Sequence, residues 1–208
     1  MIDPAGFFDF AEQIAGNVLK TNPGVNPVLA FTAHSAEGYE AYLRANPPLD
    51  ATTGGAKSWH LTTLKDGTLL QNYSLLARCW HSGEAEPNQS WVSHELEGVA
   101  GESMTEAQLA TVTRVIKEIS EWRGWTPKRD EPDRTLIEHG EVHATACPSN
   151  RYPWDTILAA LQEDDDMAVD NYPGEIDEHR AQVVLIEGIM TGKVRVYFEG
   201  AGIVLADG

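Results

Sequence analysis

The hydrophobic and polar positions along this chain follow two different spacings. Apolar residues recur every three or four positions over residues 6–20 and 105–123, which predicts amphipathic helices there. Pro153 near the start of an apolar segment favours a further helix over residues 153–161. Short apolar or alternating runs predict strands over residues 27–33, 59–64, 68–71, 90–98 and 135–138.

Two of these elements have clear end signals. Thr105 and Gln108 have the pattern of a capping box at the start of the helix, and Gly124 is a typical residue for its end. Asp66-Gly67 separates the strands over 59–64 and 68–71, and this dipeptide strongly favours a tight turn between antiparallel strands. The sequence therefore predicts a hairpin followed, after another strand, by a long helix.

The strand over residues 27–33 leads directly to a histidine. His34 follows its last residue, and open α/β sheets usually place ligand sites at the carboxyl ends of their strands. Ser35 is a good helix cap, so we expect a helix after it that carries Tyr39, Tyr42 and Leu43. Residues 46–57 are rich in Pro, Gly and Thr and are expected to form a loop.

The sequence divides into three parts. The first is an N-terminal helical segment (1–25), and the second is a main domain (26–162). The acidic stretch Glu163-Asp164-Asp165-Asp166 indicates a boundary, and residues 163–208 follow as an acidic linker and a small β region. Strand-like runs in that last part cover residues 182–187, 193–199 and 203–206.

Charge and composition exclude several classes of partner. The chain has 32 acidic and 15 basic residues, a net charge of −17, and such a surface repels nucleic acid. No apolar run reaches the roughly 18 residues of a membrane span, so we expect no membrane insertion. The N-terminus lacks the basic start and apolar stretch of a secretory signal, so we expect a cytoplasmic product or one that another agent exports.

Three residues are candidate ligands of one zinc ion. His139 and Cys147 lie eight residues apart, with Pro148 directly after the cysteine, and imidazole and thiolate are ligands that zinc prefers. A catalytic zinc takes three protein ligands and leaves one position for water, and His34 is our candidate for the third. His143 is a rival ligand. A disulfide between Cys79 and Cys147 is the alternative use of that cysteine.

Such a site suits hydrolysis of an amide. A zinc ion lowers the pKa of bound water and polarises a carbonyl oxygen. A nearby carboxylate then takes a proton from water and gives one to the leaving amine. Glu95 is our candidate because it lies on a predicted strand, whereas its neighbour His94 points to the opposite face and is expected to be structural.

The motifs of the chain, taken in order, resemble the zinc-dependent N-acetylmuramoyl-L-alanine amidase family. That family includes phage endolysins, bacterial anhydromuramyl-peptide amidases and animal peptidoglycan recognition proteins. The resemblance covers about residues 26–161, and five weak motifs in the family's order make it specific. They are His34-Ser35-Ala36-Glu37-Gly38, Ser58-Trp59-His60 with Asp66-Gly67-Thr68, Trp80-His81-Ser82-Gly83, Glu95-Leu96-Glu97-Gly98, and His139-Gly140-Glu141-Val142 with Thr145-Ala146-Cys147-Pro148.

The resemblance implies an α/β fold, with a mixed central β-sheet flanked by helices and a zinc ion in a groove above the sheet. It implies cleavage of the bond between N-acetylmuramic acid and L-alanine in peptidoglycan. By position, His34, His139 and Cys147 would be the zinc ligands, and Glu95 the catalytic carboxylate. Thr145 would help to hold the oxyanion. The implied substrate contacts are Trp59, His60 and His81.

Two positions depart from the family pattern, and they leave a second function open. Trp59 stands where many members have a catalytic Tyr, and its indole can donate a hydrogen bond but cannot take a proton. Thr145 stands where some members have Lys, which reduces positive charge near the oxyanion. The first expectation is a phage endolysin, held in the host cytoplasm until its release to the cell wall. A non-catalytic muropeptide-binding module and a virion-associated or toxin domain are the alternatives.

Overall fold

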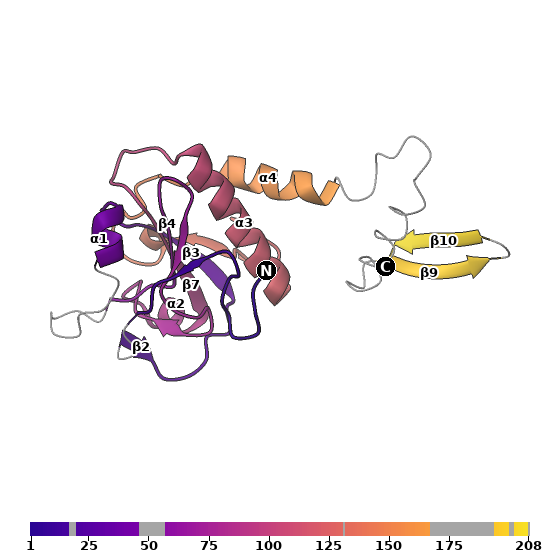
Figure 1. The fold of residues 1–208 in the computed structure, drawn as a ribbon, viewed down its shortest axis with the longest axis horizontal. Helices are drawn as coiled ribbons and strands as arrows, with labels where there is room; N and C mark the ends of the chain where they lie inside the picture. Colours follow the sequence, from indigo (N-terminus) through magenta and orange to yellow (C-terminus); the bar gives the residue numbers. More distant parts are fainter. Residues whose placement is uncertain (17–19, 46–56, 131, 167–193, 200–201, 208) are drawn as a thin grey trace. The chain divides into compact units, whose positions relative to one another are not determined.

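The computed structural model describes residues 1–16, 20–45, 57–130, 132–166, 194–199 and 202–207. The strands of these residues are β1 (Glu12–Gln13), β2 (Thr21–Asn22), β3 (Ala30–Ser35), β4 (Leu61–Thr63), β5 (Leu69–Gln71), β6 (Arg78–Cys79), β7 (Trp91–Leu96), β8 (Leu136–Glu138), β9 (Val194–Glu199) and β10 (Gly202–Asp207). The helices are α1 (Glu40–Ala45), α2 (Ala85–Ser90), α3 (Glu106–Arg123), the short 3-10 helix η2 (His139–Glu141) and α4 (Trp154–Asp166). Figure 1 shows how they follow one another along the chain.

A mixed six-stranded sheet forms the centre of the fold, in the order β1-β5-β4-β7-β3-β8. Strand β3 pairs in parallel with both β7 and β8, and β4 pairs in parallel with β7. Strands β4 and β5 are antiparallel and form the hairpin expected from Asp66-Gly67. The mixed sheet with flanking helices confirms the predicted fold class.

The two faces of this sheet differ in chemistry. Phe31 and Ala33 of β3 and Val92 and Leu96 of β7 belong to one hydrophobic core, together with the buried stripe of α3 (Val112, Val115, Ile116 and Ile119). Side chains alternate between the faces of a strand, so the residues between them point the other way. This second face, which we call the polar face, carries Thr32, His34, Thr62, Ser93 and Glu95. The helix α3 therefore covers one face and leaves the other for chemistry (Figure 1).

The helix α3 confirms its predicted ends. Thr105 accepts the N–H of Gln108, and the Gln108 side chain accepts the N–H of Thr105, so both halves of the capping box are present. Gly124 ends the helix in the left-handed conformation, with φ of 71°. Local signals suffice here because the capping groups all lie within one turn of the chain.

The helix expected over residues 6–20 is wrong in the described part of that segment. The N–H groups of Ile14 and Gly16 donate to carbonyl oxygens of Gln71 and Asn72, and β1 pairs with β5. Phe8 is buried in the core, and a side chain at Gly16 would clash with the ring of Tyr73. The backbone therefore extends along the edge of the sheet, and this pairing overrides the helical spacing of the apolar residues.

The helix cap expected at Ser35 is also corrected. Ser35 is the last residue of β3 and does not cap a helix, since α1 begins at Glu40. The N–H of Glu40 instead donates to the buried carboxylate of Glu97 at 2.7 Å. Glu97 therefore binds the start of α1. The loop expected over 46–57 lies outside the described residues except for its last position.

The chain divides into two compact units, Met1–Glu163 and Asp164–Gly208. Residues 1–25 belong to the first unit. In the second, β9 and β10 form an antiparallel pair, in agreement with strands predicted over 193–199 and 203–206. The strand predicted over 182–187 lies outside the described residues. No helix in the described part of the chain is long and apolar enough to cross a membrane.

Candidate active site

The polar face places a histidine and a carboxylate side by side. His34 of β3 and Glu95 of β7 are partners in the parallel register. Paired residues on neighbouring strands point to the same face of a sheet, so both side chains rise from the same surface. Thr62 of β4 is the partner of Glu95 on its other side, and the indole N–H of Trp59 donates to the Thr62 hydroxyl at 2.9 Å.

Three ligand-type side chains converge above this surface. One ligand atom from each of His34, His139 and Cys147 lies within 4.8 Å of the other two. The distance from Cys147 Sγ to His34 Nδ1 is 3.9 Å, and the ring centroids of the two histidines are 4.6 Å apart. Two imidazoles and one thiol at these separations can reach a single cation with small side-chain movements, and this donor set is one that suits zinc.

Each histidine uses its second ring nitrogen in a hydrogen bond. His139 Nε2 is 3.0 Å from the carbonyl oxygen of Ser82, and His34 Nε2 is 3.1 Å from His81 Nδ1. The His81 ring in turn places Nε2 at 3.0 Å from the carbonyl oxygen of Pro87. Both candidate ligands therefore have an outer partner, as metal-binding histidines usually do.

The protonation states of the three side chains follow from burial. Burial lowers the pKa of His34 well below its usual value and also lowers that of His139, so both rings are neutral near pH 7. Burial raises the pKa of Cys147 to about 11, and the Glu95 carboxylate contributes in the same direction. Metal-free Cys147 is therefore a thiol, and a cation would bind with loss of its proton.

The loop that carries Cys147 folds back on η2 because residue 140 is glycine. The N–H of Gly140 donates to the carbonyl oxygen of Cys147 at 2.7 Å. A Cβ at this position would lie 2.8 Å from the Thr145 oxygen and 3.0 Å from the Cys147 oxygen. The N–H of Ser35 donates to Cys147 Sγ at 3.2 Å, which fixes the sulfur at the end of β3. Thr145 is exposed, and its hydroxyl accepts the N–H of Cys147 at 3.2 Å.

Glu95 has the environment of a proton-transfer group. Its Oε2 is buried and has no hydrogen-bond partner among the described residues. Burial raises the pKa of Glu95 to about 8; Lys57 opposes this change and Glu37 adds to it. A carboxyl group with a pKa near neutrality can both donate and accept a proton under ordinary conditions.

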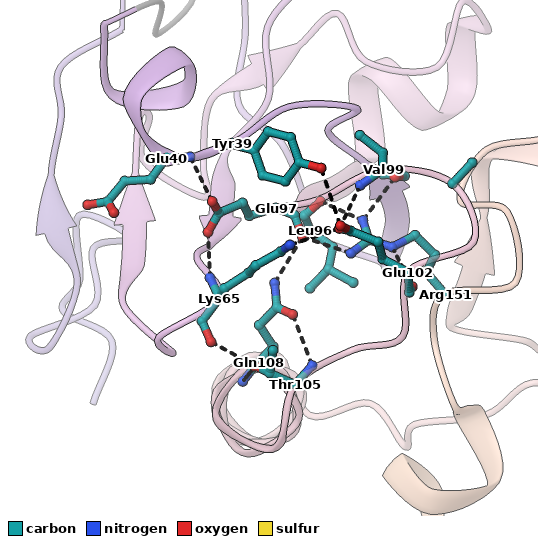
Figure 2. Close-up of polar contacts among 12 residues, drawn as sticks. Tyr39, Glu40, Lys65, Leu96, Glu97, Val99, Glu102, Thr105, Gln108 and Arg151 are labelled. Carbon is teal, nitrogen blue, oxygen red and sulfur yellow. Dashed lines mark hydrogen bonds and ion pairs between the residues drawn. The ribbon is translucent and has the colours of Figure 1, made fainter.

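A buried arginine holds the segment after Cys147 against the strand ends (Figure 2). Arg151 is 3% exposed, and its guanidinium donates to the carbonyl oxygens of Leu96, Glu97 and Glu102 at 3.0, 2.8 and 3.1 Å. It also donates to the Ser35 hydroxyl at 3.0 Å. Because Arg151 follows Cys147 by four residues, these bonds tie the cysteine loop to β7 and to the residue after His34.

Glu97 joins three further elements next to Arg151 (Figure 2). Its two carboxylate oxygens accept the N–H of Glu40 at the start of α1 and the N–H of Lys65 in the hairpin turn, the latter at 2.5 Å. Gln108 of α3 donates to the Glu97 carbonyl oxygen at 3.1 Å. The strand that carries Glu95 is therefore held by α1, α3 and the hairpin together.

The three residues implied as substrate contacts differ in how accessible their side chains are. His60 is fully buried, with its ring nitrogens 2.8 Å from the Ser93 hydroxyl and 2.9 Å from the Ala77 oxygen. No part of the His60 side chain is accessible in this structure, so the implied contact of His60 with substrate stays a prediction that this geometry does not support. Both ring nitrogens of His81 are also engaged, so they are not available to a substrate. Trp59 is half-buried.

Other sequence expectations near the site have clear outcomes. His94 is buried between the Thr63 and Tyr152 hydroxyls, at 2.7 and 2.8 Å, which confirms its structural role. His143 is exposed and pairs with Glu84, and it is not part of the convergent group. Both cysteines are free, so no disulfide joins them.

Sequence reasoning missed three residues that organise the site, namely Gly140, Arg151 and Asn88. Asn88 is buried, and its Oδ1 accepts the N–H groups of His81 and Ser82 at 2.8 and 2.9 Å. Only Gly140 had a local signal, since a glycine directly after a candidate ligand suggests a close backbone approach. The partners of Arg151 and Asn88 lie on other elements, and no pattern along the chain indicates them.

Comparison with known proteins agrees with this geometry. The family model described as N-acetylmuramoyl-L-alanine amidase matches residues 24–150. That range contains all three convergent side chains and Glu95, and it covers more than half of the chain. The chain belongs to the N-acetylmuramoyl-L-alanine amidase family, whose members are enzymes that hydrolyse an amide bond. A comparison with curated protein sequences finds no match.

Solved structures share the fold at low sequence identity. The endolysin N-acetylmuramoyl-L-alanine amidase LysCS from Clostridium intestinale superposes with a TM-score of 0.57 at 18% identity, over 73% of this chain and 95% of its own. A selenomethionine derivative of AmpD gives 0.58 at 18% identity, over 77% and 98%. Drosophila peptidoglycan recognition protein SD gives 0.52 at 14% identity, over 81% and 92%. These likenesses show the fold alone.

Proposed function

We propose that this protein is a zinc-dependent amidase that cleaves the bond between N-acetylmuramic acid and L-alanine in bacterial peptidoglycan. One observation carries the proposal: the convergence of His34, His139 and Cys147 to within 4.8 Å, beside Glu95, whose Oε2 atom is buried. His34 lies more than 100 residues before His139 and Cys147 in the sequence, and the fold brings it to them at the end of β3. Family membership supplies the class of reaction.

The roles of the residues follow from their environments. His34, His139 and Cys147 would hold zinc, which when bound acts as a Lewis acid on the amide carbonyl. Glu95 would take a proton from the attacking water and deliver it to the leaving amine nitrogen, since its pKa of about 8 suits both steps. Thr145 is exposed beside Cys147, and its hydroxyl would donate to the oxygen that becomes negative.

The biological setting is part of the same proposal. The fold neighbour LysCS is named as an endolysin, and this supports a role in phage-mediated lysis of a host cell. In that setting the protein would stay in the host cytoplasm until release and then act on the cell wall. The net charge of −17 disfavours simple electrostatic attachment to an anionic wall, so binding would depend on specific contacts.

A matched pair of cysteine variants tests the metal site. Cys147→Ser is expected to lose zinc, because a hydroxyl is a poor zinc ligand at neutral pH. Cys79→Ser is the control, since Cys79 is free, buried and not part of the convergent group. Zinc content of the purified proteins is measured together with release of new N-terminal alanine from cell walls. Full zinc occupancy in Cys147→Ser would remove the basis of the proposal.

The second candidate is a binding module that holds muropeptide without cleaving it. It is favoured by Trp59, which cannot take a proton, and by the fold likeness to a peptidoglycan recognition protein. Glu95→Ala separates the candidates. An enzyme keeps its zinc and loses most turnover in this variant, whereas a binding module binds walls equally with either residue. Wall binding by the unmodified protein without new N-terminal alanine would favour the second candidate.

A further inference from the structure

The turn of His81 and Ser82 contacts both candidate histidine ligands, although neither residue belongs to the convergent group. His81 Nδ1 faces His34 Nε2, and the Ser82 carbonyl oxygen faces His139 Nε2. One two-residue segment therefore supplies the outer hydrogen-bond partner of two ligands that lie 105 residues apart in the sequence.

The directions of the hydrogen bonds from His34 and His81 follow from the Pro87 carbonyl oxygen, where this series of contacts ends. A carbonyl oxygen can only accept, so the contact of His81 with the Pro87 oxygen places the proton of His81 on Nε2. The Nδ1 atom of neutral His81 then accepts, which requires that His34 carries its proton on Nε2. His34 Nδ1 is left with a free lone pair, and this is the atom that faces Cys147 Sγ at 3.9 Å.

The same reasoning applies to the second ligand. The Ser82 oxygen can only accept, so His139 carries its proton on Nε2 and has its lone pair on Nδ1. Both histidines are thus held as the tautomer with an unprotonated Nδ1. A free histidine in water exchanges between its two tautomers, whereas the fixed partners on the protein hold each of these rings in one of them.

The turn itself is held rigidly. Asn88 is buried, and its Oδ1 accepts the N–H of His81, the N–H of Ser82 and the Ser82 hydroxyl at 2.8, 2.9 and 3.1 Å. The Ser82 hydroxyl oxygen also accepts the N–H of Glu84 at 3.1 Å. One side chain therefore holds the backbone of both residues, while the Pro87 carbonyl oxygen orients the His81 ring.

We propose that His81 and Asn88 are positioning residues for the metal site, which select the Nδ1-ligating tautomer of His34 and His139 before any metal binds. The proposal rests on the zinc site proposed above, and it replaces the expectation that His81 contacts substrate. It predicts that the correct tautomers are present in the metal-free protein, so that binding needs no ring rotation or proton shift on the histidines.

The first experiment needs no variant and no metal. Two-dimensional ¹H–¹⁵N NMR of the metal-free protein reports which ring nitrogen of each histidine carries the proton. We expect a protonated Nε2 and a bare Nδ1 for His34, His81 and His139 in the uniform neutral state. A protonated Nδ1 on His34, or an equal mixture of tautomers, overturns the proposal.

The second experiment compares variants of His81 by zinc affinity, measured by competition with a chromophoric chelator. His81→Phe removes the acceptor for His34, and we expect zinc to bind about 10–100 times more weakly. His81→Gln keeps an amide oxygen toward His34 and an N–H toward Pro87, and it should recover most of the affinity. Asn88→Ala should resemble His81→Phe, and Asn88→Asp, which keeps an acceptor oxygen, should bind more tightly than Asn88→Ala.

The outcomes separate this inference from the function on which it rests. If the unmodified protein binds no zinc, the proposed function fails, while the NMR experiment still decides the tautomers. If the unmodified protein binds zinc and His81→Phe binds it equally well, only the positioning role fails. Circular dichroism of each variant identifies any that does not fold, in which case the glutamine and aspartate variants carry the test.

Discussion

The buried Arg151 offers a quantitative test of how the site is held together. Its guanidinium makes four hydrogen bonds, to three carbonyl oxygens and to the Ser35 hydroxyl, and all of them are removed in Arg151→Leu. Leucine retains part of the apolar volume, so the change mainly removes polar contacts. Arg151 connects the Cys147 loop to β3 and β7, and the effect should therefore reach both stability and metal binding.

The magnitude follows from the partners that remain. In Arg151→Leu the carbonyl oxygen of Leu96 still accepts the N–H of Ala36, and that of Glu97 still accepts the side-chain amide of Gln108. These two oxygens are therefore not left without a hydrogen-bond partner. Four lost bonds at about 1 kcal/mol each give about 4 kcal/mol, and release of a buried charge from a poorly solvated site offsets part of this. We expect the free energy of unfolding to fall by about 2–4 kcal/mol.

Urea denaturation of the metal-free protein measures this change. The midpoint should shift to lower urea with an unchanged slope, because the surface exposed on unfolding is similar. Arg114→Leu is the control, since Arg114 pairs with Glu118 on the surface with its side chain 52% exposed and should change stability by less than about 1 kcal/mol. A loss below about 1 kcal/mol for Arg151→Leu would contradict the role assigned to these bonds.

Three further changes test other parts of the structure. In metal-free protein, the raised pKa of Glu95 means that its protonated form is favoured by folding, so its contribution to stability is complete below pH 4.5 and is lost as the pH rises through about 8. Glu95→Gln should therefore gain stability relative to the unmodified protein as the pH rises from 4.5 to about 8, by about 1.4 kcal/mol per pH unit. Urea titrations at several pH values measure this difference in the free energy of unfolding. A difference that does not change with pH would refute the raised pKa of Glu95. Gly140→Ala places a Cβ 2.8 Å from the Thr145 oxygen, so zinc affinity should fall about tenfold in the chelator assay while the fold is retained; unchanged affinity would show that the loop adapts freely. Thr105→Ala removes the cap of α3 and should lower the thermal midpoint by an amount equivalent to about 1 kcal/mol, with Thr105→Ser as a control that keeps the hydroxyl.

Local patterns determined those elements whose signals lie close together in the sequence. The capping box and the terminal glycine of α3, and the Asp66-Gly67 turn of the hairpin, act within a few residues, so the residues that form each signal are visible in one short stretch of sequence. The alternation of side chains along β7 likewise separated Glu95 from His94. The residue types of His34, His139 and Cys147 suggested zinc chemistry because few other side chains bind that ion well.

The N-terminal segment shows where such patterns fail. Residues 6–16 have apolar residues at helical spacing, yet their backbone pairs with β5 and places Phe8 in the core. Apolar residues at helical spacing are also compatible with an extended segment along a sheet edge, when a partner strand accepts its backbone hydrogen bonds. Only the tertiary structure supplies that partner.

The chemistry of the site divides in the same way. The sequence by itself determined which side chains have the chemistry to bind a metal and move a proton, because that chemistry belongs to the residue type. The tertiary structure decided which of them meet, and it shows His60 and His81, two of the implied substrate contacts, as hydrogen-bonded parts of the framework. It also revealed that Arg151 and Asn88 hold the loops of the site by hydrogen bonds. Burial and the direction of hydrogen bonds depend on neighbours that are distant along the chain, and these become adjacent only when the sheet has formed.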